Sequence, residues 1–303
     1  MRAVCLAIVA LLGATGPALA ADQGVHEMPL DIPTPSRVEQ TVRHTKAKTL
    51  NGKTESAWVE TRSLATIGFD EKAETYKVTL KVLDRTASTP EILPILSATL
   101  PAEISYLADE SLRPIKLIDA EATKARLIAF AQSVSPQMGA MAEKTFATMS
   151  AEGAANLMLK EQSYLSIGYN LGLKVGEPQT YDGEQASPLG SGSVKLKGSV
   201  VLDSYDDKAG RALVTWKEFI DPESAMVLGV QTVKQMTGKD VSAELVRPGP
   251  EVAKVEATKG CRFEIDTRNG FIRKADCYQS VVTPEPAGSA THERWAITQT
   301  LTN

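Results

Sequence analysis

The chain has few of the residues on which most enzymes and metal proteins depend. It contains three histidines, three cysteines and 5% aromatic residues among its 303. His26, His44 and His292 are far apart, and none belongs to an H-E-x-x-H motif or a Cys/His cluster. A nucleophile elbow, a phosphate-binding loop and a D-x-D-x-D-G calcium loop are also missing. We therefore expect no metal, no cofactor and no enzymatic activity.

Strong charge and long apolar runs are missing as well. The formal net charge is −4, and this mild acidity argues against a nucleic-acid or membrane partner held by charge alone. The scarcity of aromatic residues weakens a function that relies on stacking, such as binding of carbohydrate or single-stranded nucleic acid. We expect no nucleic-acid partner and no transmembrane anchor.

The N-terminus has the three parts of a bacterial secretory signal peptide. Residues 1–2 supply a positive start, residues 3–12 are mostly apolar, and residues 18–20 form an A-x-A cleavage site. An uncleaved membrane anchor is the alternative, but the apolar run is shorter than the roughly 20 residues that span a bilayer. We predict cleavage before Ala21 and export to the oxidising, ATP-poor periplasm.

Two cysteines remain after cleavage, and their spacing predicts a disulfide. Asn269-Gly270 lies between Cys261 and Cys277 as a turn signal. A three-residue loop with Gly270 in the left-handed conformation places the cysteines opposite each other on adjacent strands. A redox-active pair is the alternative, but the C-x-x-C spacing that lowers a thiol pKa is missing. We therefore predict a structural cross-strand disulfide.

Period-two alternation and helical periodicity occupy different parts of the chain. Residues 120–164 read as helical, with breaks near Pro136 and Ser150. Strand-like runs precede and follow them. We predict an α+β fold with a large curved antiparallel β-sheet, half-barrel-like, and helices inserted mid-chain. The main strand-like runs are Tyr76–Val82, Ile104–Leu107, Pro114–Ile118, Val194–Leu202 and Cys261–Tyr278.

Composition divides the chain into five predicted segments. After the signal peptide (1–20), residues 21–36 hold three prolines after position 28 and no periodicity, and we interpret them as a flexible leader. Residues 37–173 form a first β-rich half with the helical segment, and residues 174–193 a linker-like loop. Residues 194–303 form a second β-rich half with the disulfide hairpin.

The two halves share a faint internal repeat. The segment 69–73 (Phe-Asp-Glu-Lys-Ala) aligns without gaps on 205–209 (Tyr-Asp-Asp-Lys-Ala). Each copy is followed by a Pro-Glu helix start and then by a hairpin with an aspartate near its turn. A chance likeness between strand–turn–strand segments and a duplicated unit both explain this pattern.

Methionines gather in the helical middle of the chain. Soft, unbranched side chains suit an adaptable apolar cavity, so we consider them candidate ligand-lining residues, and the alternative is that they fill the core between helix and sheet. We expect Met141 and Met158 to contact a bound lipid. The full set is Met138, Met141, Met149 and Met158.

Adjacent acids such as Asp109-Glu110 and Asp206-Asp207 fall at predicted turns. Carboxylate pairs catalyse glycoside hydrolysis only when they face each other across a scissile bond. At turns and helix caps, acids serve local hydrogen bonding. We therefore expect these acids to be structural, and a hydrolase whose acids meet only in the fold is a third, weaker hypothesis.

In outline, the strand runs and the plug-like helices of residues 120–164 resemble the LolA-like lipoprotein carriers of the bacterial envelope, over most of the chain and in pattern only. The resemblance implies a curved sheet closed by helices over an apolar ligand cavity. Our first hypothesis is a periplasmic, non-catalytic protein that binds a lipid or an acylated partner between sheet and helices. The second is an envelope interaction or structural protein with a filled core, which recognises a protein partner by an exposed sheet edge.

Overall fold

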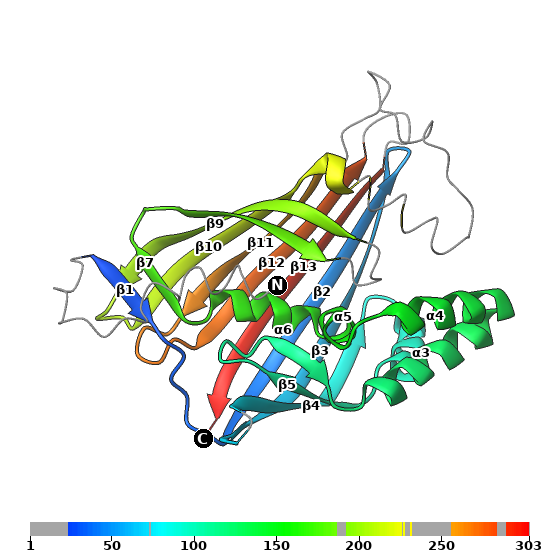
Figure 1. Cartoon of the computed structure of the whole chain (residues 1–303), viewed down its shortest axis with the longest axis horizontal. Coiled ribbons are helices and arrows are strands. Elements are labelled where there is room, and N and C mark those ends of the chain that lie inside the picture. The colour runs from blue at the N-terminus through cyan, green and yellow to red at the C-terminus, as the bar shows by residue number, and fades with distance from the viewer. Residues whose placement is uncertain are drawn as a thin grey trace.

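The computed structural model describes residues 24–72, 74–186, 192–225, 227, 231, 256–283 and 289–302. The predicted signal peptide and its cleavage site lie outside these residues and stay a prediction. The described residues form one large antiparallel sheet, a small two-stranded sheet and a helical layer (Figure 1). Within them, no helix is both long and apolar enough to cross a membrane.

Thirteen strands are described. They are β1 (Val25–Met28), β2 (Ser36–Leu50), β3 (Lys53–Asp70), β4 (Thr75–Ala87), β5 (Glu103–Ala108), β6 (Pro114–Leu117), β7 (Leu171–Lys174), β8 (Gln179–Ala186), β9 (Ser193–Asp206), β10 (Arg211–Ile220), β11 (Glu256–Ile265), β12 (Ile272–Thr283) and β13 (Ser289–Thr302). The large sheet has 11 strands in the order β6-β5-β4-β3-β2-β13-β12-β11-β10-β9-β8, and β1 pairs with β7 apart from it. The predicted α+β fold with one large antiparallel sheet is confirmed.

The helical segment lies where its periodicity predicts. Its breaks fall at Pro136 and Ser150, and the side chains of Ser135 and Ser150 cap the helices that follow. Asp119 is at the N-cap of the first of these helices, without a side-chain hydrogen bond. The helices are η1 (Pro90–Ile92), α2 (Leu93–Thr99), α3 (Ala120–Val134), α4 (Pro136–Thr148), α5 (Ala151–Met158), α6 (Lys160–Leu165) and η2 (Ser166–Gly168).

Alternation of side chains gives the sheet two faces. We call the face that packs against α5, α6 and η2 the inner face. On β10, for example, Ala212, Val214 and Trp216 are buried on the inner face, whereas Phe219 is 55% exposed on the outer face. The helices α5 and α6 cross the middle of the strands (Figure 1), and their Ala154, Ala155 and Leu165 pack into the core. The core therefore lies between this helical layer and the sheet.

The segment predicted as a flexible leader contains a strand instead. β1 pairs antiparallel with β7, and Met28 is only 1% exposed within the core. Asn170, at a positive φ of 55°, accepts a hydrogen bond from the backbone N–H of Leu30 at 2.7 Å. The absence of period-two alternation concealed this strand because it is short and pairs outside the main sheet.

The predicted linker over residues 174–193 is also corrected. Its residues 179–186 are β8, which pairs with β9 and forms one edge of the large sheet. The glycines at this edge suit the pairing: at Gly198 a Cβ atom would come within 2.2 Å of the Tyr181 ring. The two predicted halves therefore belong to one continuous sheet, which they join through β2 and β13.

Both halves repeat the same order of elements. β2, β3, β4, β5 and β6 follow one another across one part of the sheet, and β8, β9, β10, β11 and β12 do so across the other. In each half a helical turn stands between the third and the fourth strand, at residues 90–92 in the first and at residues 222–225 in the second. The hairpins that carry the sequence echo, β3–β4 and β9–β10, occupy the same place in this order. The topology agrees with a duplicated unit.

The hairpin β11–β12 pairs Cys261 with Cys277 as the sequence predicts, and their sulfurs lie 2.12 Å apart. Gly270 has the expected positive φ, of 65°. The loop differs from the prediction because a bulge pairs Ile265 with Ile272. Hydrogen bonds from Arg268, and then from Arg273, lower the pKa of the Asp266 carboxyl beside this loop to about 2.

The disulfide should contribute strongly to the stability of the sheet. We expect the double variant Cys261→Ser/Cys277→Ser to lose about 3 kcal/mol of unfolding free energy, because the unfolded chain is no longer closed into a loop. Urea denaturation followed by tryptophan fluorescence measures the loss. Reduction of the unmodified protein should shift the midpoint equally, and an unshifted midpoint in both cases would contradict the prediction.

Candidate functional site

The four methionines predicted to line a ligand do not form one site. Met149 is buried in the core and Met158 packs against it. Met138 and Met141 lie on α4, each 44% exposed. Met141 and Met158 therefore belong to different parts of the helical segment, and contact of both with a bound lipid stays a prediction.

Among the described residues, the space between α6 and the sheet is nearly filled. Under α6 a cavity of about 20 Å³ lies among residues that include Val38, Tyr106 and Leu165. A shallow depression of about 90 Å³, lined in part by Glu39 and Arg62, lies elsewhere on the sheet. Pockets for drug-sized ligands measure roughly 300–1,000 Å³. A lipid chain beneath these helices would therefore need them to move.

An aromatic row borders the filled core on the inner face. Trp295, Cys277, Cys261 and Trp216 lie side by side on β13, β12, β11 and β10. Tyr164 of α6 packs on both indoles, with ring centroids 5.2 Å from Trp295 and 6.2 Å from Trp216. The disulfide thus lies between the two tryptophans, under the helix.

The next row along the same strands is charged except for one glutamine, and we call it the ionic row. Its members, from β2 to β10, are Lys46, Glu293, Gln279, Lys259 and Glu218, each paired with its neighbour in register. Charged side chains are rarely placed on the inner face of a sheet unless they are paired. The inner face of the sheet is therefore not uniformly hydrophobic.

Glu218 is the most deeply buried acid of the row, and the residue is 5% exposed. Lys259 pairs with it at 2.5 Å (Nζ–Oε1), and the Tyr181 hydroxyl donates to Oε2 at 3.0 Å. The indole N–H of Trp216 donates to the Tyr181 oxygen at 2.7 Å. This chain of contacts holds a buried carboxylate at the border of the aromatic row.

Glu293 collects three cationic or ionisable neighbours. Lys46, Lys160 of α6 and His44 lie 3.0, 3.4 and 3.5 Å from its carboxylate oxygens. Burial acts to raise the pKa of Glu293, but the lysines and His44 together outweigh it and lower that pKa. Burial lowers the pKa of His44, which stacks on Trp295 with ring centroids 4.7 Å apart. Lys160 lies over the same indole, at 4.3 Å.

Beyond the ionic row, the inner face becomes apolar again. Leu196, Ile220, Ala257 and Val281 lie side by side on β9, β10, β11 and β12, and we call them the apolar strip. The helix α6 packs on the aromatic row, which flanks the ionic row on its other side, and Tyr164 of this helix also contacts Gln279. The strip and the ionic row together place apolar and charged groups in adjacent lines.

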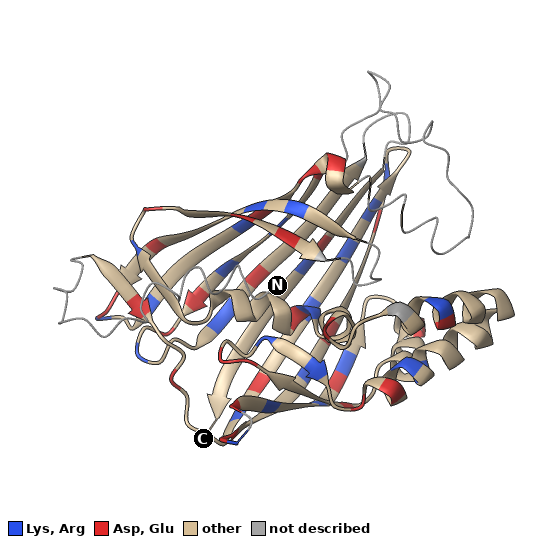
Figure 2. Cartoon of the chain, viewed as in Figure 1, with Lys and Arg blue, Asp and Glu red and all other residues tan. Residues whose placement is uncertain are grey.

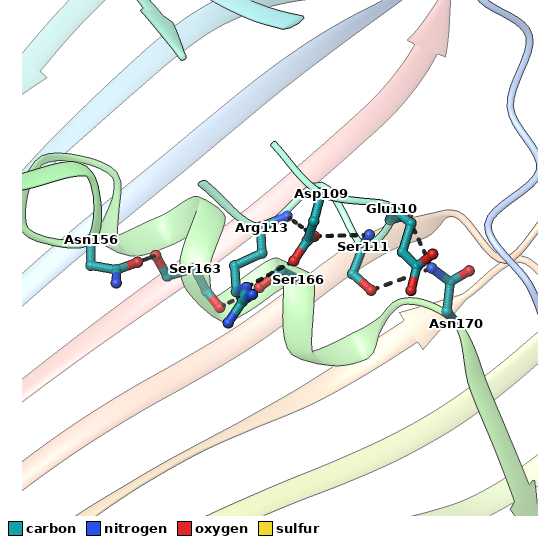
Figure 3. Close-up of polar contacts among 8 residues, drawn as sticks. All are labelled: Asp109, Glu110, Ser111, Arg113, Asn156, Ser163, Ser166 and Asn170. Atoms are coloured by element: carbon teal, nitrogen blue, oxygen red, sulfur yellow. Dashed lines mark hydrogen bonds and ion pairs between the residues drawn. The ribbon is translucent and has the colours of Figure 1, made fainter. Parts of the chain in front are cut away.

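The acid pairs at predicted turns have local roles. Asp109 accepts the backbone N–H groups of Ser111 and Arg113, both at 3.0 Å, and the Arg113 guanidinium at 2.9 Å (Figure 3). Asn170 donates to the backbone oxygen of Glu110 at 3.0 Å, which fastens this turn to the segment after η2. Asp206 likewise accepts the N–H of Ala209 at its turn, at 2.9 Å. Within the described residues no three His, Cys, Asp or Glu side chains gather as a metal site would require.

No protein-family model matches the chain. No curated protein matches it either. Solved structures similar to it include the hypothetical lipoprotein YmcC from Escherichia coli, with 11% identity, a TM-score of 0.25, and coverage of 83% of this chain and 82% of that one.

Two other similar structures have still lower TM-scores. DynF, from the dynemicin biosynthesis pathway of Micromonospora chersina, is 4% identical with a TM-score of 0.20, covering 94% of this chain and 92% of that one. A domain named for outer membrane lipoprotein sorting, from Vibrio parahaemolyticus, is 10% identical with a TM-score of 0.17, covering 90% and 88%. Two of the three names concern lipoproteins, but likenesses this weak decide nothing about ligand or partner.

The sequence pattern identified most of the strands but did not reveal the ionic row. Its members come from β2, β10, β11, β12 and β13, which are separated in sequence and adjacent only in the sheet. A signal was present in the alternation itself. Glu218 has the same phase as Val214 and Trp216, and Lys259 the same phase as Cys261 and Phe263. A charged residue in the buried phase of a strand is the feature that could have revealed the row.

Because Glu218 is buried, its partner should matter for stability. We expect Lys259→Met to destabilise the protein by about 3–5 kcal/mol, since it leaves a carboxylate buried without its counter-ion. The double variant Glu218→Gln/Lys259→Met should recover part of that loss. Lys274→Met is the matched control, because Lys274 pairs with Glu264 across the same two strands but is 63% exposed, and it should cost at most about 1 kcal/mol. Equal effects of the two lysine variants in urea denaturation would contradict the prediction.

The lowered pKa of His44 predicts a pH dependence. In the unfolded chain, His44 binds a proton near the ordinary pKa of 6.5. In the folded protein, burial of His44 disfavours this protonation. Stability should therefore fall as the pH drops below about 6.5. His44→Gln should flatten this part of the stability–pH curve, whereas His292→Gln, a change on the exposed outer face, should leave it unchanged. A curve that His44→Gln does not alter would contradict the assignment.

Proposed function

We propose that this protein is a non-catalytic component of the bacterial envelope that binds a lipid or an acylated partner on the inner face of its sheet. The apolar chain lies along the apolar strip, and the polar end of the ligand meets the ionic row. The ligand then lies beside α6 rather than beneath it, where the core is filled.

The observation that carries the proposal is the adjacency of the two rows. On β10, β11 and β12, the strip residues Ile220, Ala257 and Val281 each stand two positions from a member of the ionic row on the same face. Two residues along a strand span about 7 Å. An amphiphile needs this arrangement, because its chain gains from apolar contact while its polar end needs partners that a hydrophobic cavity does not offer.

The ionic row contains both lysines and glutamates, which can pair with a negatively or a positively charged head group. Lys46 and Lys160 surround Glu293 at one end, and Lys259 pairs with Glu218 at the other. The side chain of Lys46 is 56% exposed, so it remains accessible to an anionic group such as a phosphate or carboxylate. The Glu218 end is buried and serves to fix Tyr181 and Trp216.

A second candidate is an interaction protein with no small ligand. The filled space beneath α5 and α6 favours it. Among the described residues, the edge strands β6 and β8 each have one side without a partner strand in the large sheet. Such edges are natural docking sites for an extended segment of another protein.

Native mass spectrometry of protein purified from periplasm without detergent separates these two functions. A discrete additional mass that extracts into organic solvent as lipid would support the ligand-binding proposal. A bare polypeptide, together with no uptake of a fluorescent fatty acid or lysophospholipid, would contradict it and favour the interaction protein.

A single substitution tests the position of the chain. We expect Val281→Asp to reduce binding of a fluorescent fatty acid about tenfold or more, because it places a carboxylate in the apolar strip. Val282→Asp is the matched control on the same strand, since Val282 lies on the outer face, and it should leave binding unchanged. Circular dichroism checks that both variants fold. Equal binding by both would show that the strip is not the site.

A further inference from the structure

The helices α3 and α4 form an arm that extends away from the sheet (Figure 1). They are joined at Ser135, whose side chain caps α4 by accepting the N–H of Met138 at 3.1 Å. They pack closely, because a Cβ atom at Gly139 would lie 2.2 Å from Gln132 of α3. The arm is therefore a defined helical hairpin that contacts the body near its base.

The outer part of this arm has no charge. Residues 127–142 include no Asp, Glu, Lys or Arg, although they form the end of the arm that lies away from the sheet (Figure 2). Val134 is 55% exposed, and Met138 and Met141 are each 44% exposed. A surface helix normally presents charged residues to water. An exposed, uncharged helical tip instead indicates a surface that is removed from water when the protein functions.

Cations stand where the uncharged tip ends. Arg126 on α3 and Lys144 on α4 are exposed at its border, and the exposed Glu143 precedes Lys144 there. Lys124 pairs with Glu121, and Glu143 accepts a hydrogen bond from Gln132. The arm therefore carries a small positive excess in a protein whose formal net charge is −4.

We propose that this arm inserts its uncharged tip into the interfacial layer of a lipid bilayer. The tip comprises about two turns of each helix, which is roughly 10–12 Å at 1.5 Å per residue. Interfacial helices bury their apolar face about 5–10 Å deep. At that depth Arg126 and Lys144 reach the level of the lipid phosphates.

The charge pattern favours lipid over a protein surface as the occupant. A lipid surface offers apolar chains beneath a layer of phosphates, and the arm offers Met138 and Met141 beyond a border with two cations, Arg126 and Lys144, and one acid, Glu143. The attraction is chiefly apolar, because the protein as a whole is acidic and gains nothing from long-range charge. This inference does not depend on the ligand proposed for the inner face of the sheet.

Vesicle flotation tests the proposal with the mature chain. We expect the protein to float with vesicles of phosphatidylethanolamine and phosphatidylglycerol. The variant Met138→Glu/Met141→Glu should lower the partition coefficient about tenfold or more, because two apolar contacts are replaced by charges. Leu83→Glu/Phe219→Glu is the matched control: these side chains are 51% and 55% exposed on the sheet, and the control should float like the unmodified protein.

A spectroscopic label reports insertion directly. Since Cys261 and Cys277 are paired, a thiol introduced into the mature chain is uniquely reactive. A nitrobenzoxadiazole label on Met141→Cys should shift its emission to the blue when vesicles are added, whereas the same label on Leu83→Cys should not.

Three outcomes would overturn the proposal. They are no flotation of the unmodified protein, equal flotation of both double variants, and equal emission shifts at the two labelled sites. Sedimentation in the absence of lipid identifies the rival occupant: if the unmodified protein self-associates and Met138→Glu/Met141→Glu abolishes this without altering flotation, the arm binds a second copy of the chain instead of a bilayer.

Discussion

The rest of the structure depends on one constraint: the inner face of the 11-stranded sheet must be covered. The two edge strands of this sheet do not pair with each other, so the sheet is open. Alternation gives every strand one side to bury, and an open sheet must find a cover for that side elsewhere in the chain. Here the cover is the segment of α5, α6 and η2, inserted between β6 and β7, with the small sheet of β1 and β7 beside it. Because this cover crosses only the middle of the strands, the inner face changes character along their length, from filled core to aromatic row, ionic row and apolar strip.

The ionic row is the part of this arrangement that stability alone does not explain. Burial of an ion pair seldom stabilises a protein more than well-packed apolar residues of similar size would. Glu218 and Lys259 nevertheless occupy positions that alternation assigns to the core, and Tyr181 and Trp216 are oriented around them. A polar row between two apolar surfaces lets one face of a sheet hold a molecule that is itself partly polar. Binding of an amphiphile, as proposed, would explain why the row is present despite the free-energy cost of burying its charges.

The arm of α3 and α4 is not needed to cover the sheet. Its uncharged tip neither covers the sheet nor contributes a fully buried large side chain to the core. The repeated order of strands, β2–β6 and β8–β12, builds a complete sheet without it. A binding face and a lipid-directed arm on the same molecule would together suit a protein that meets membranes and carries or senses amphiphiles.

Local pattern by itself determined much of this protein. Period-two runs predicted most of the strands, and Pro136 and Ser150 predicted the breaks between helices. The spacing around Gly270 predicted the pairing of Cys261 with Cys277. Each of these features depends on neighbours close in the chain. Local pattern could not reveal that residues 25–28 pair with β7, that the supposed linker is an edge strand, or that Lys46, Glu218, Lys259 and Glu293 form one row. Those features were decided by the tertiary structure, because they depend on which distant strands become neighbours, and hydrophobic periodicity specifies the face of a residue but not its partner across the sheet.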